Sequence, residues 1–480
     1  MTTRPRRLSP LDASFLAVES DTAPMHVGWA AVFSPSGDDA RPTFEQLRDH
    51  IAARMGRAPR YRQRLARVPL GLQPPVWVDD EHFAVERHVR HDTSRDLAAL
   101  AGAVMSEPLR ADRPLWEIVI ADRLADGRIG VIGKVHHCMV DGIAAVELAG
   151  LLLDPTPDAP PMIAPAWRPA PAPDGAALLA GAARDLADRQ LGLLAAAWRT
   201  ARAPRGVVGV VRAARQAGGA LAGSARPAPP SGLNVPISSQ RRLEIFERPL
   251  DDVRRAAASC RVSLNDLVLA ATAGGVRRLM LARNEPATAL KTMVPVNVRE
   301  SGAESELGNR ISFMFVDLPC NIAEPLERVH AVHSHTTELK QAQAASGGAT
   351  VLSLLALAPP PVQAVISRAT ASRRVFNLTV SNVPGPGEPL WMRGCRLDAA
   401  FPVIPLADDH GVSVGMTTIA GRACFGVYAD PVAVPDAALL ATGIEEDLDE
   451  LSGVAESLAP PRPTGRFTRS IDRPLVPVGD

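Results

Sequence analysis

Prolines crowd the stretch from Pro155 to Pro173 and divide the chain of 480 residues into two long parts. Proline lacks a backbone N–H and has a fixed φ, so this stretch can hold neither a helix interior nor a central strand. A chain of this length also exceeds what one ordinary hydrophobic core supports. We therefore expect an N-terminal domain over 1–154, a linker and helical crossover over 155–240, a second domain over 241–459 and a flexible tail over 460–480.

Both parts alternate the periodicities of strands and helices, which predicts an α/β fold for each. In the first part, strands are expected at Met25–Phe33, Trp116–Ala121 and Ile129–Val135, and helices at Thr43–Met55, Leu97–Met105 and Ile143–Leu153. In the second, strands are expected at Leu243–Glu247, Leu290–Val296, Ile311–Leu318, Phe376–Ser381, Val412–Ile419 and Ala423–Tyr428. Ser263 with Asp266 forms a capping-box pattern that opens a helix reaching about Leu281.

The segment from Ala176 to Ala222 is rich in alanine and locally basic, with seven arginines against two aspartates. Its composition favours helix. Two interpretations stay open. The segment is either a solvated crossover packed on the domains, or a helix pair that lies on anionic lipid headgroups.

Composition excludes several classes of protein. Lys plus Arg equals Asp plus Glu at 52 each, which argues against a nucleic-acid-binding protein. The five cysteines are far apart and lack metal-ligand spacing, so we expect no metal site and a reducing, cytoplasmic compartment. Acidic residues interrupt any signal peptide near the N-terminus, and no segment reaches the roughly 20 apolar residues of a membrane span.

The strongest chemical signal is the run His136-His137-Cys138-Met139-Val140-Asp141-Gly142, which directly follows a predicted strand. Asp126-Gly127 joins that strand to the preceding one as a hairpin. Neighbouring strand residues point to opposite faces, so His136 and His137 cannot both serve one reacting atom unless the strand has ended. One imidazole is therefore expected to be structural. The other has a suitable pKa for removing a proton from a hydroxyl.

Asp141 and Gly142 suggest how this turn is built, because Asp can cap a following helix while it bonds an arginine, and Gly lets the backbone turn closely. Local features alone leave other interpretations open. The histidines could be hydrogen-bonded core residues, or, with a carboxylate, metal ligands, although adjacent histidines chelate poorly.

A serine esterase is a further alternative, since Gly411-Val412-Ser413-Val414-Gly415 matches a nucleophile elbow, with His410 beside it. That motif requires a strand, a sharp turn and a helix. The residues that follow Gly415 instead read as a β-hairpin, which disfavours this alternative.

The His-His-x-x-x-Asp-Gly run after a strand resembles the active-site motif of the chloramphenicol-acetyltransferase-like superfamily, which includes condensation domains of peptide synthetases. Further segments, in the same order from about Leu8 to Gly453, are similar to the bacterial wax ester synthase/diacylglycerol acyltransferase family. They are Leu11-Asp12 with Met25-His26, Arg113-Pro114-Leu115-Trp116-Glu117, Ser263-Leu264-Asn265-Asp266, Val294-Pro295-Val296-Asn297-Val298-Arg299, Gly308-Asn309-Arg310 and Ser381-Asn382-Val383-Pro384-Gly385-Pro386.

The resemblance implies two similar α/β lobes with an active-site tunnel at their interface, and acyl-CoA as a co-substrate with no cofactor. It implies that His137 is the general base, that His136 is structural or supporting, and that Asp141 holds the turn through Arg299 or Arg310. Asn265 would help to position substrate, Pro114, Leu115 and Trp116 would shape the pocket floor, and Asp266 is equally well explained as a helix cap.

The function that the resemblance implies is transfer of a long-chain acyl group from acyl-CoA to diacylglycerol or a fatty alcohol, through a ternary complex. A condensation-type enzyme fed by a carrier protein and a non-catalytic lipid-binding relative are the rival interpretations. We expect a cytoplasmic protein that contacts the inner face of the membrane or lipid droplets peripherally.

Overall fold

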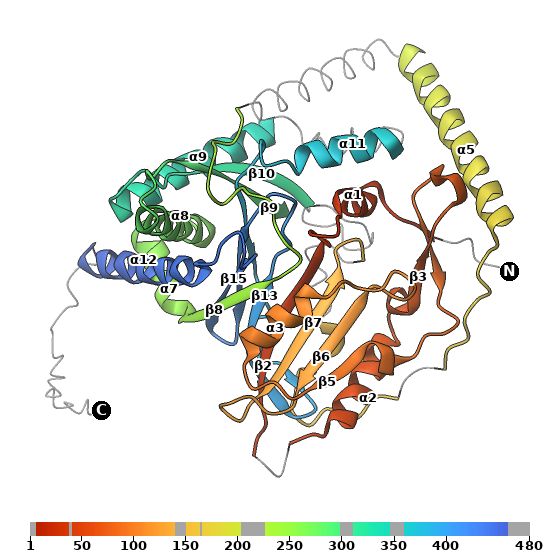
Figure 1. The fold of residues 1–480 in the computed structure, drawn as a ribbon, viewed down its shortest axis with the longest axis horizontal. Helices are drawn as coiled ribbons and strands as arrows, with labels where there is room; N and C mark the ends of the chain where they lie inside the picture. Colours follow the sequence, from red (N-terminus) through yellow and green to blue (C-terminus); the bar gives the residue numbers. More distant parts are fainter. Residues whose placement is uncertain are drawn as a thin grey trace, which may run out of the picture.

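Two six-stranded sheets dominate the computed structural model, which describes residues 6–37, 41–139, 150–163, 166–202, 226–297, 311–345 and 360–458. Figure 1 shows them as two lobes, one built mainly from the N-terminal half and one from the C-terminal half. The α/β class expected for both parts of the chain is confirmed.

The N-terminal sheet has the strand order β12-β13-β2-β7-β6-β5. Its strands are β2 (His26–Ser34), β5 (Val89–Asp92), β6 (Trp116–Ala121), β7 (Ile129–His136), β12 (Trp391–Met392) and β13 (Cys395–Val403). The hairpin predicted at Asp126-Gly127 joins β6 to β7, and Gly127 adopts a φ of 82° that favours glycine. β2 and β7 pair antiparallel, so that His26 lies opposite His136.

Three helices accompany this sheet, each begun by a side-chain cap. They are α1 (Pro10–Val18), α2 (Phe44–Met55) and α3 (Leu97–Ser106), capped by Ser9, Thr43 and Asp96. The predicted helix Ile143–Leu153 falls largely outside the described residues. A separate sheet of β1 (Arg6–Arg7), β4 (Val76–Asp79) and β3 (Gln63–Ala66), and the 3₁₀ turns η2 (Pro59–Arg62), η3 (Pro69–Gly71) and η4 (Val85–Arg87), complete this part.

The C-terminal sheet has the order β10-β9-β11-β14-β15-β8. Its strands are β8 (Arg242–Pro249), β9 (Leu290–Asn297), β10 (Ile311–Leu318), β11 (Leu378–Val383), β14 (Val412–Ile419) and β15 (Arg422–Ala429). The helices are α7 (Leu250–Ser259), α8 (Leu264–Ala282), α9 (Pro325–Ala345), α11 (Pro360–Thr370) and α12 (Ala437–Leu458). The capping box predicted for Ser263 and Asp266 is present at the start of α8.

Strand β13 belongs to the N-terminal sheet although it follows β11 in the chain. It pairs antiparallel with β2, from Arg396 opposite Ser34 to Val403 opposite Gly28. Its buried and exposed residues alternate, but Pro402 lies within it, and a proline argues against a strand interior when only the sequence is read. The return of the chain into the N-terminal sheet at β13 was therefore not predicted. This strand links the two lobes.

The lobes also share a hydrophobic core. Val104 and Met105 of α3 pack in one cluster with Leu243 of β8, Phe401 of β13 and Tyr428 of β15. Met25, the residue before His26, belongs to the same cluster, so the ends of β2 and β7 that carry His26 and His136 lie next to this interface.

The proline-rich stretch follows a bridge between Asp154 and Trp391 and forms no helix or strand among its described residues. It leads into α5 (Gly175–Arg202), which confirms helix for the first part of the basic segment. Figure 1 shows α5 along the outer edge of the molecule, away from both six-stranded sheets. The rest of that segment (203–225) and the predicted tail lie outside the described residues. None of the described helices is long and apolar enough to cross a membrane.

Candidate active site

Strand β7 ends at His136, and residues 137–139 form a turn. The backbone N–H of His137 donates to the carbonyl oxygen of Met25 at 3.0 Å, and that of Met139 donates to the carbonyl of His136 at 2.9 Å. The strand therefore ends between the two histidines. The alternation of a strand therefore no longer applies to His137, and the contacts of each imidazole decide its role.

His136 is a buried part of the turn. Its Nδ1 accepts the backbone N–H of Cys138 at 3.0 Å, and its Nε2 lies 3.4 Å from Oε1 of Glu19, the residue that ends α1. A neutral imidazole has one donor and one acceptor nitrogen, so Nε2 carries the proton and faces Glu19. This geometry fits a structural role.

His137 is half-buried and lies against α1. Its ring stacks on that of Phe15, with the centroids 3.7 Å apart and the planes 16° from parallel. An imidazole held in one plane at the end of a buried strand is suited to proton transfer with a bound hydroxyl.

Cys138 occupies the apolar side of the turn. It packs with Leu8, Trp77 and Leu115, and Leu16 of α1 packs against the same cluster. Burial, and then the carboxylates of Asp12 and Glu19, raise the pKa of the Cys138 thiol well above its usual value. The thiol therefore stays protonated and is a poor nucleophile.

Pro114, Leu115 and Trp116 lie directly beside the turn. The carbonyl of Leu115 accepts the backbone N–H of His136 at 2.9 Å. The Trp116 indole N–H donates to the Tyr61 carbonyl at 2.8 Å, and the indole stacks on His88. These residues support the strand end from the core, and their contact with substrate stays a prediction.

Two polar neighbours of the turn went unnoticed as site residues. The sequence motif Met25-His26 assigned no role to His26, whose Nε2 accepts the Leu109 N–H at 3.3 Å. Burial, followed by the charge of Lys134, lowers its pKa well below the ordinary value, so His26 stays neutral. Lys134 itself is buried, and its Nζ lies 2.9 Å from Oε2 of Glu117. The sequence signal that could have identified Lys134 is its position as a lysine inside an otherwise apolar predicted strand.

Phe15 and Glu19 were also missed. Both lie on or next to α1, which Ser9 and Pro10 open with a cap followed by proline, a start signal for a helix. Reading that signal would have placed a helix before β2, but not against the histidines. Contact between α1 and the turn depends on tertiary packing.

Asn265 occupies the first turn of α8 and is half-buried. Next to it, the Asp266 carboxylate lies 2.9 Å from Nδ1 of His333 and accepts the Thr336 hydroxyl at 2.8 Å, besides capping the helix. Burial opposes the charged form of Asp266, but these hydrogen bonds prevail and its pKa is lowered. These hydrogen bonds occupy the Asp266 carboxylate inside the C-terminal lobe, and its expected role as a helix cap is confirmed. The role of Asn265 in substrate positioning stays a prediction.

Four predicted residues cannot be placed. Asp141, Gly142, Arg299 and Arg310 lie outside the described residues. The expected pairing of Asp141 with an arginine remains a prediction.

The serine-esterase arrangement does not form. Ser413 is buried within β14, where its hydroxyl donates to the Ile404 carbonyl at 2.7 Å, and β14 continues into the hairpin with β15. The nitrogens of His410 face two backbone carbonyls, those of Asp408 and Phe376. Ser413 therefore has neither the strand–turn–helix context nor the exposure of a nucleophile elbow.

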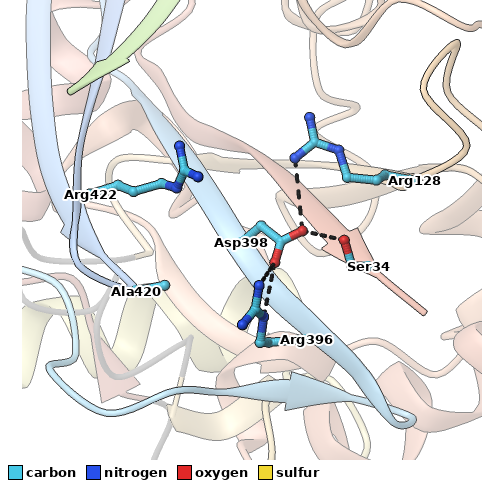
Figure 2. Close-up of a pocket in the computed structure, with 6 residues that line it drawn as sticks. All are labelled: Ser34, Arg128, Arg396, Asp398, Ala420 and Arg422. Carbon is cyan, nitrogen blue, oxygen red and sulfur yellow. Dashed lines mark hydrogen bonds and ion pairs between the residues drawn. The ribbon is translucent and has the colours of Figure 1, made fainter. Parts of the chain in front are cut away.

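A hollow of about 290 Å³ lies at the opposite end of β7 from His136. Figure 2 shows Asp398 at its centre, bonded by Ser34, Arg396 and Arg128. The guanidiniums also have carboxylates at the rim, Asp126 for Arg128 and Glu247 for Arg422. The residues that line this hollow come from both lobes. Because their charges are matched and the histidines are remote, the hollow is not the reaction site.

Two family models match most of the chain. Residues 8–268 match the wax ester synthase/diacylglycerol acyltransferase catalytic domain, and residues 307–452 match the WS/DGAT C-terminal domain. The probable diacylglycerol O-acyltransferase tgs1 of Mycobacterium tuberculosis is 33% identical over 463 residues, covering 94% of this chain and 96% of that protein. A second protein of that species, named putative diacylglycerol O-acyltransferase Rv3087, is 32% identical over 472 residues, covering 95% of this chain and 99% of that protein.

Solved structures agree. The wax ester synthase/diacylglycerol acyltransferase from Marinobacter aquaeolei VT8 superposes with a TM-score of 0.68 at 26% identity, covering 94% of this chain and 100% of that one. The first condensation domain of the calcium-dependent antibiotic synthetase has a TM-score of 0.57 at 17% identity, covering 96% and 98%, and shares the fold. The expected fold class, two chloramphenicol-acetyltransferase-like lobes, is confirmed.

Proposed function

Because the chain belongs to the wax ester synthase/diacylglycerol acyltransferase family and is an O-acyltransferase, we propose that it esterifies diacylglycerol or a fatty alcohol with a long-chain acyl group from acyl-CoA. His137 is the proposed general base. The observation that carries this assignment is the contrast between the two imidazoles: His136 is committed to the turn through Cys138, whereas His137 lies just beyond the strand end and is half-buried.

In the proposed reaction, His137 takes the proton of the acceptor hydroxyl while the oxygen forms a bond to the thioester carbonyl carbon. The tetrahedral oxyanion collapses, the carbon–sulfur bond breaks, and the proton passes from the imidazolium to the sulfur of CoA. Both substrates are bound together, and no cofactor takes part. The raised pKa of the buried Cys138 thiol supports direct transfer over an acyl-enzyme at the turn.

A product screen tests this proposal. Purified protein is given labelled palmitoyl-CoA with diacylglycerol, hexadecanol or neither, and products are separated by thin-layer chromatography. Labelled triacylglycerol or wax ester is the expected result. Ester formed only from an acyl carrier protein would identify a condensation-type enzyme, and no product with any donor would identify a lipid-binding protein.

The base is tested by substitution. His137→Ala should lower ester formation by about two to four orders of magnitude, the usual contribution of a positioned general base, with unchanged thermal unfolding. Ser413→Ala is the matched control: it removes one buried hydrogen bond, worth about 1 kcal/mol of stability, and keeps the rate. Activity that survives the first change and is lost with the second would reverse the assignment.

We further propose that the enzyme reaches its membrane-borne acceptor by peripheral contact through α5. Leu191 and Trp198 on this outlying helix are exposed, and so are Leu70 of η3 and Leu72 directly after it. The start of α5 packs against η3. Apolar side chains beside an arginine-rich segment are the composition of an interfacial helix.

A further inference from the structure

Phe15 makes the tightest ring contact with a histidine among the described residues. Its centroid lies 3.7 Å from that of His137, against 4.2 Å for Phe376 with His410 and 5.3 Å for Phe83 with His88. The planes of Phe15 and His137 are also the most nearly parallel of these three pairs. The imidazole that the proposed function uses thus has one face covered by an aromatic ring.

Helix α1 is built to hold Phe15 in that place. At its start, the Ser9 hydroxyl caps the helix by accepting the Asp12 N–H at 3.0 Å. At its end, Glu19 faces His136, and Nε of Arg368 on α11 donates to the Ala17 carbonyl at 2.8 Å. The helix is therefore capped at its start and fixed at its end to both the histidine turn and a helix of the C-terminal half, and Phe15 lies between these two ends.

We propose that Phe15 is a positioning residue that stabilises the imidazolium form of His137 through its ring face. The inference rests on the proposed function, in which the acceptor O–H bond breaks, an N–H bond forms on His137 and the ring gains a positive charge. The face of a phenyl ring carries the negative part of its quadrupole, so it attracts a cation placed over it. The charge exists only after proton transfer has begun, and the contact therefore favours the transition state over the ground state.

The charged and titratable groups around the turn must be considered in any test that uses pH. Among the described residues they include Asp12 and Glu19 on or next to α1, Arg60 in η2, His26 in β2, Lys134, His136 and Cys138 in or after β7, and Arg368 in α11. None of them is changed by replacing Phe15 with another uncharged residue. A shift in the titration of His137 therefore reports on the ring.

Three variants test the proposal. Phe15→Leu keeps an apolar side chain but removes the ring, and Phe15→Tyr keeps the ring. Phe83→Leu removes a phenylalanine–histidine stack that includes neither His136 nor His137. In Phe15→Leu, the acid limb of kcat/KM should move to lower pH by about 0.5 to 1 unit, and kcat should fall about 2- to 30-fold. In Phe15→Tyr and Phe83→Leu, the acid limb of the pH profile of kcat/KM should stay at its wild-type position.

A second readout needs no turnover. Diethyl pyrocarbonate reacts with neutral imidazole, so the pH dependence of its reaction at His137, followed by mass spectrometry, should shift in the same direction in Phe15→Leu. An unchanged limb and an unchanged labelling curve would overturn the proposal, as would an equal shift in Phe83→Leu. If Phe15→Leu does not fold, Phe15→Met makes the same comparison. Failure of the wild type to form ester would reject the proposed function, whereas the labelling curve would still test the stack.

Discussion

Nδ1 of His136 accepts the backbone N–H of Cys138, two residues further along the chain, at 3.0 Å. Asparagine and aspartate side chains make the same bond in Asx-turns. His136→Asn should therefore preserve the turn and most of the activity, whereas His136→Leu leaves a buried donor unsatisfied. The second variant should lose about 1 to 3 kcal/mol of unfolding free energy together with most of its ester formation.

Thermal unfolding and initial rates of the two variants provide the measurement. Equal loss of activity in both, with unchanged unfolding temperatures, would mean that the His136 imidazole takes part in the chemistry itself. The supporting role assigned to it would then be wrong.

The strands around the histidines and the hairpin before them were readable from the sequence, because both depend on neighbouring residues. The largely apolar run that became β7 and the hairpin signal at Asp126-Gly127 placed the histidines at a strand end. The stack of Phe15 on His137 and the insertion of β13 next to β2 join residues far apart in the chain. No local pattern encodes such contacts, and Pro402 makes β13 look unlike a strand.

The buried ion pair of Lys134 and Glu117 should stabilise the strand that ends in the histidines. Lys134 Nζ also donates to the carbonyls of Val104 and Glu107, at 2.7 and 3.0 Å, so its ammonium is held inside the lobe. Glu117→Gln leaves that charge without its counter-ion, a loss of about 3 to 5 kcal/mol in the free energy of unfolding.

Denaturant titration measures this loss, and Glu107→Gln is the control. The Glu107 carboxylate is exposed and pairs with Arg90 at the surface, so its removal should cost less than about 1 kcal/mol. Similar midpoints for the two variants would show that Lys134 is neutral or solvated in the folded protein.

Buried His50 should make the fold sensitive to mild acid. Its Nε2 lies 2.8 Å from the Leu152 carbonyl, and burial lowers its pKa to about 4 from 6.5. Between these values the unfolded chain binds a proton that the folded chain does not, so stability falls as the pH falls through this window. The contribution lost below pH 4 is on the order of 3 kcal/mol.

His50→Gln can keep the hydrogen bond to Leu152 without titrating. Its unfolding free energy should therefore change less steeply between pH 6.5 and 4 than that of the wild type. His82→Gln, at an exposed position, should retain the wild-type slope. Parallel wild-type and His50→Gln curves would show that the buried imidazole does not account for the acid sensitivity.

The membrane role proposed for α5 separates into an apolar and a charged contribution. Leu191 is 64% and Trp198 63% exposed, and the segment 176–222 carries seven arginines against two aspartates. Each arginine near an anionic surface contributes about 1 kcal/mol of attraction, which salt screens. Replacing Arg199, Arg202, Arg205 and Arg212 by Gln should therefore weaken the salt-sensitive part of sedimentation with vesicles of phosphatidylglycerol and phosphatidylcholine.

The pair Leu191→Ser with Trp198→Ser should instead weaken binding at high salt as well, because apolar contact is not screened. Both sets of variants should keep wild-type rates with a short, water-soluble alcohol while they lose rate with diacylglycerol in vesicles. Vesicle binding that neither set changes at low salt would assign α5 to a solvated crossover. Loss of rate with the soluble alcohol would show that α5 supports the fold of the active site.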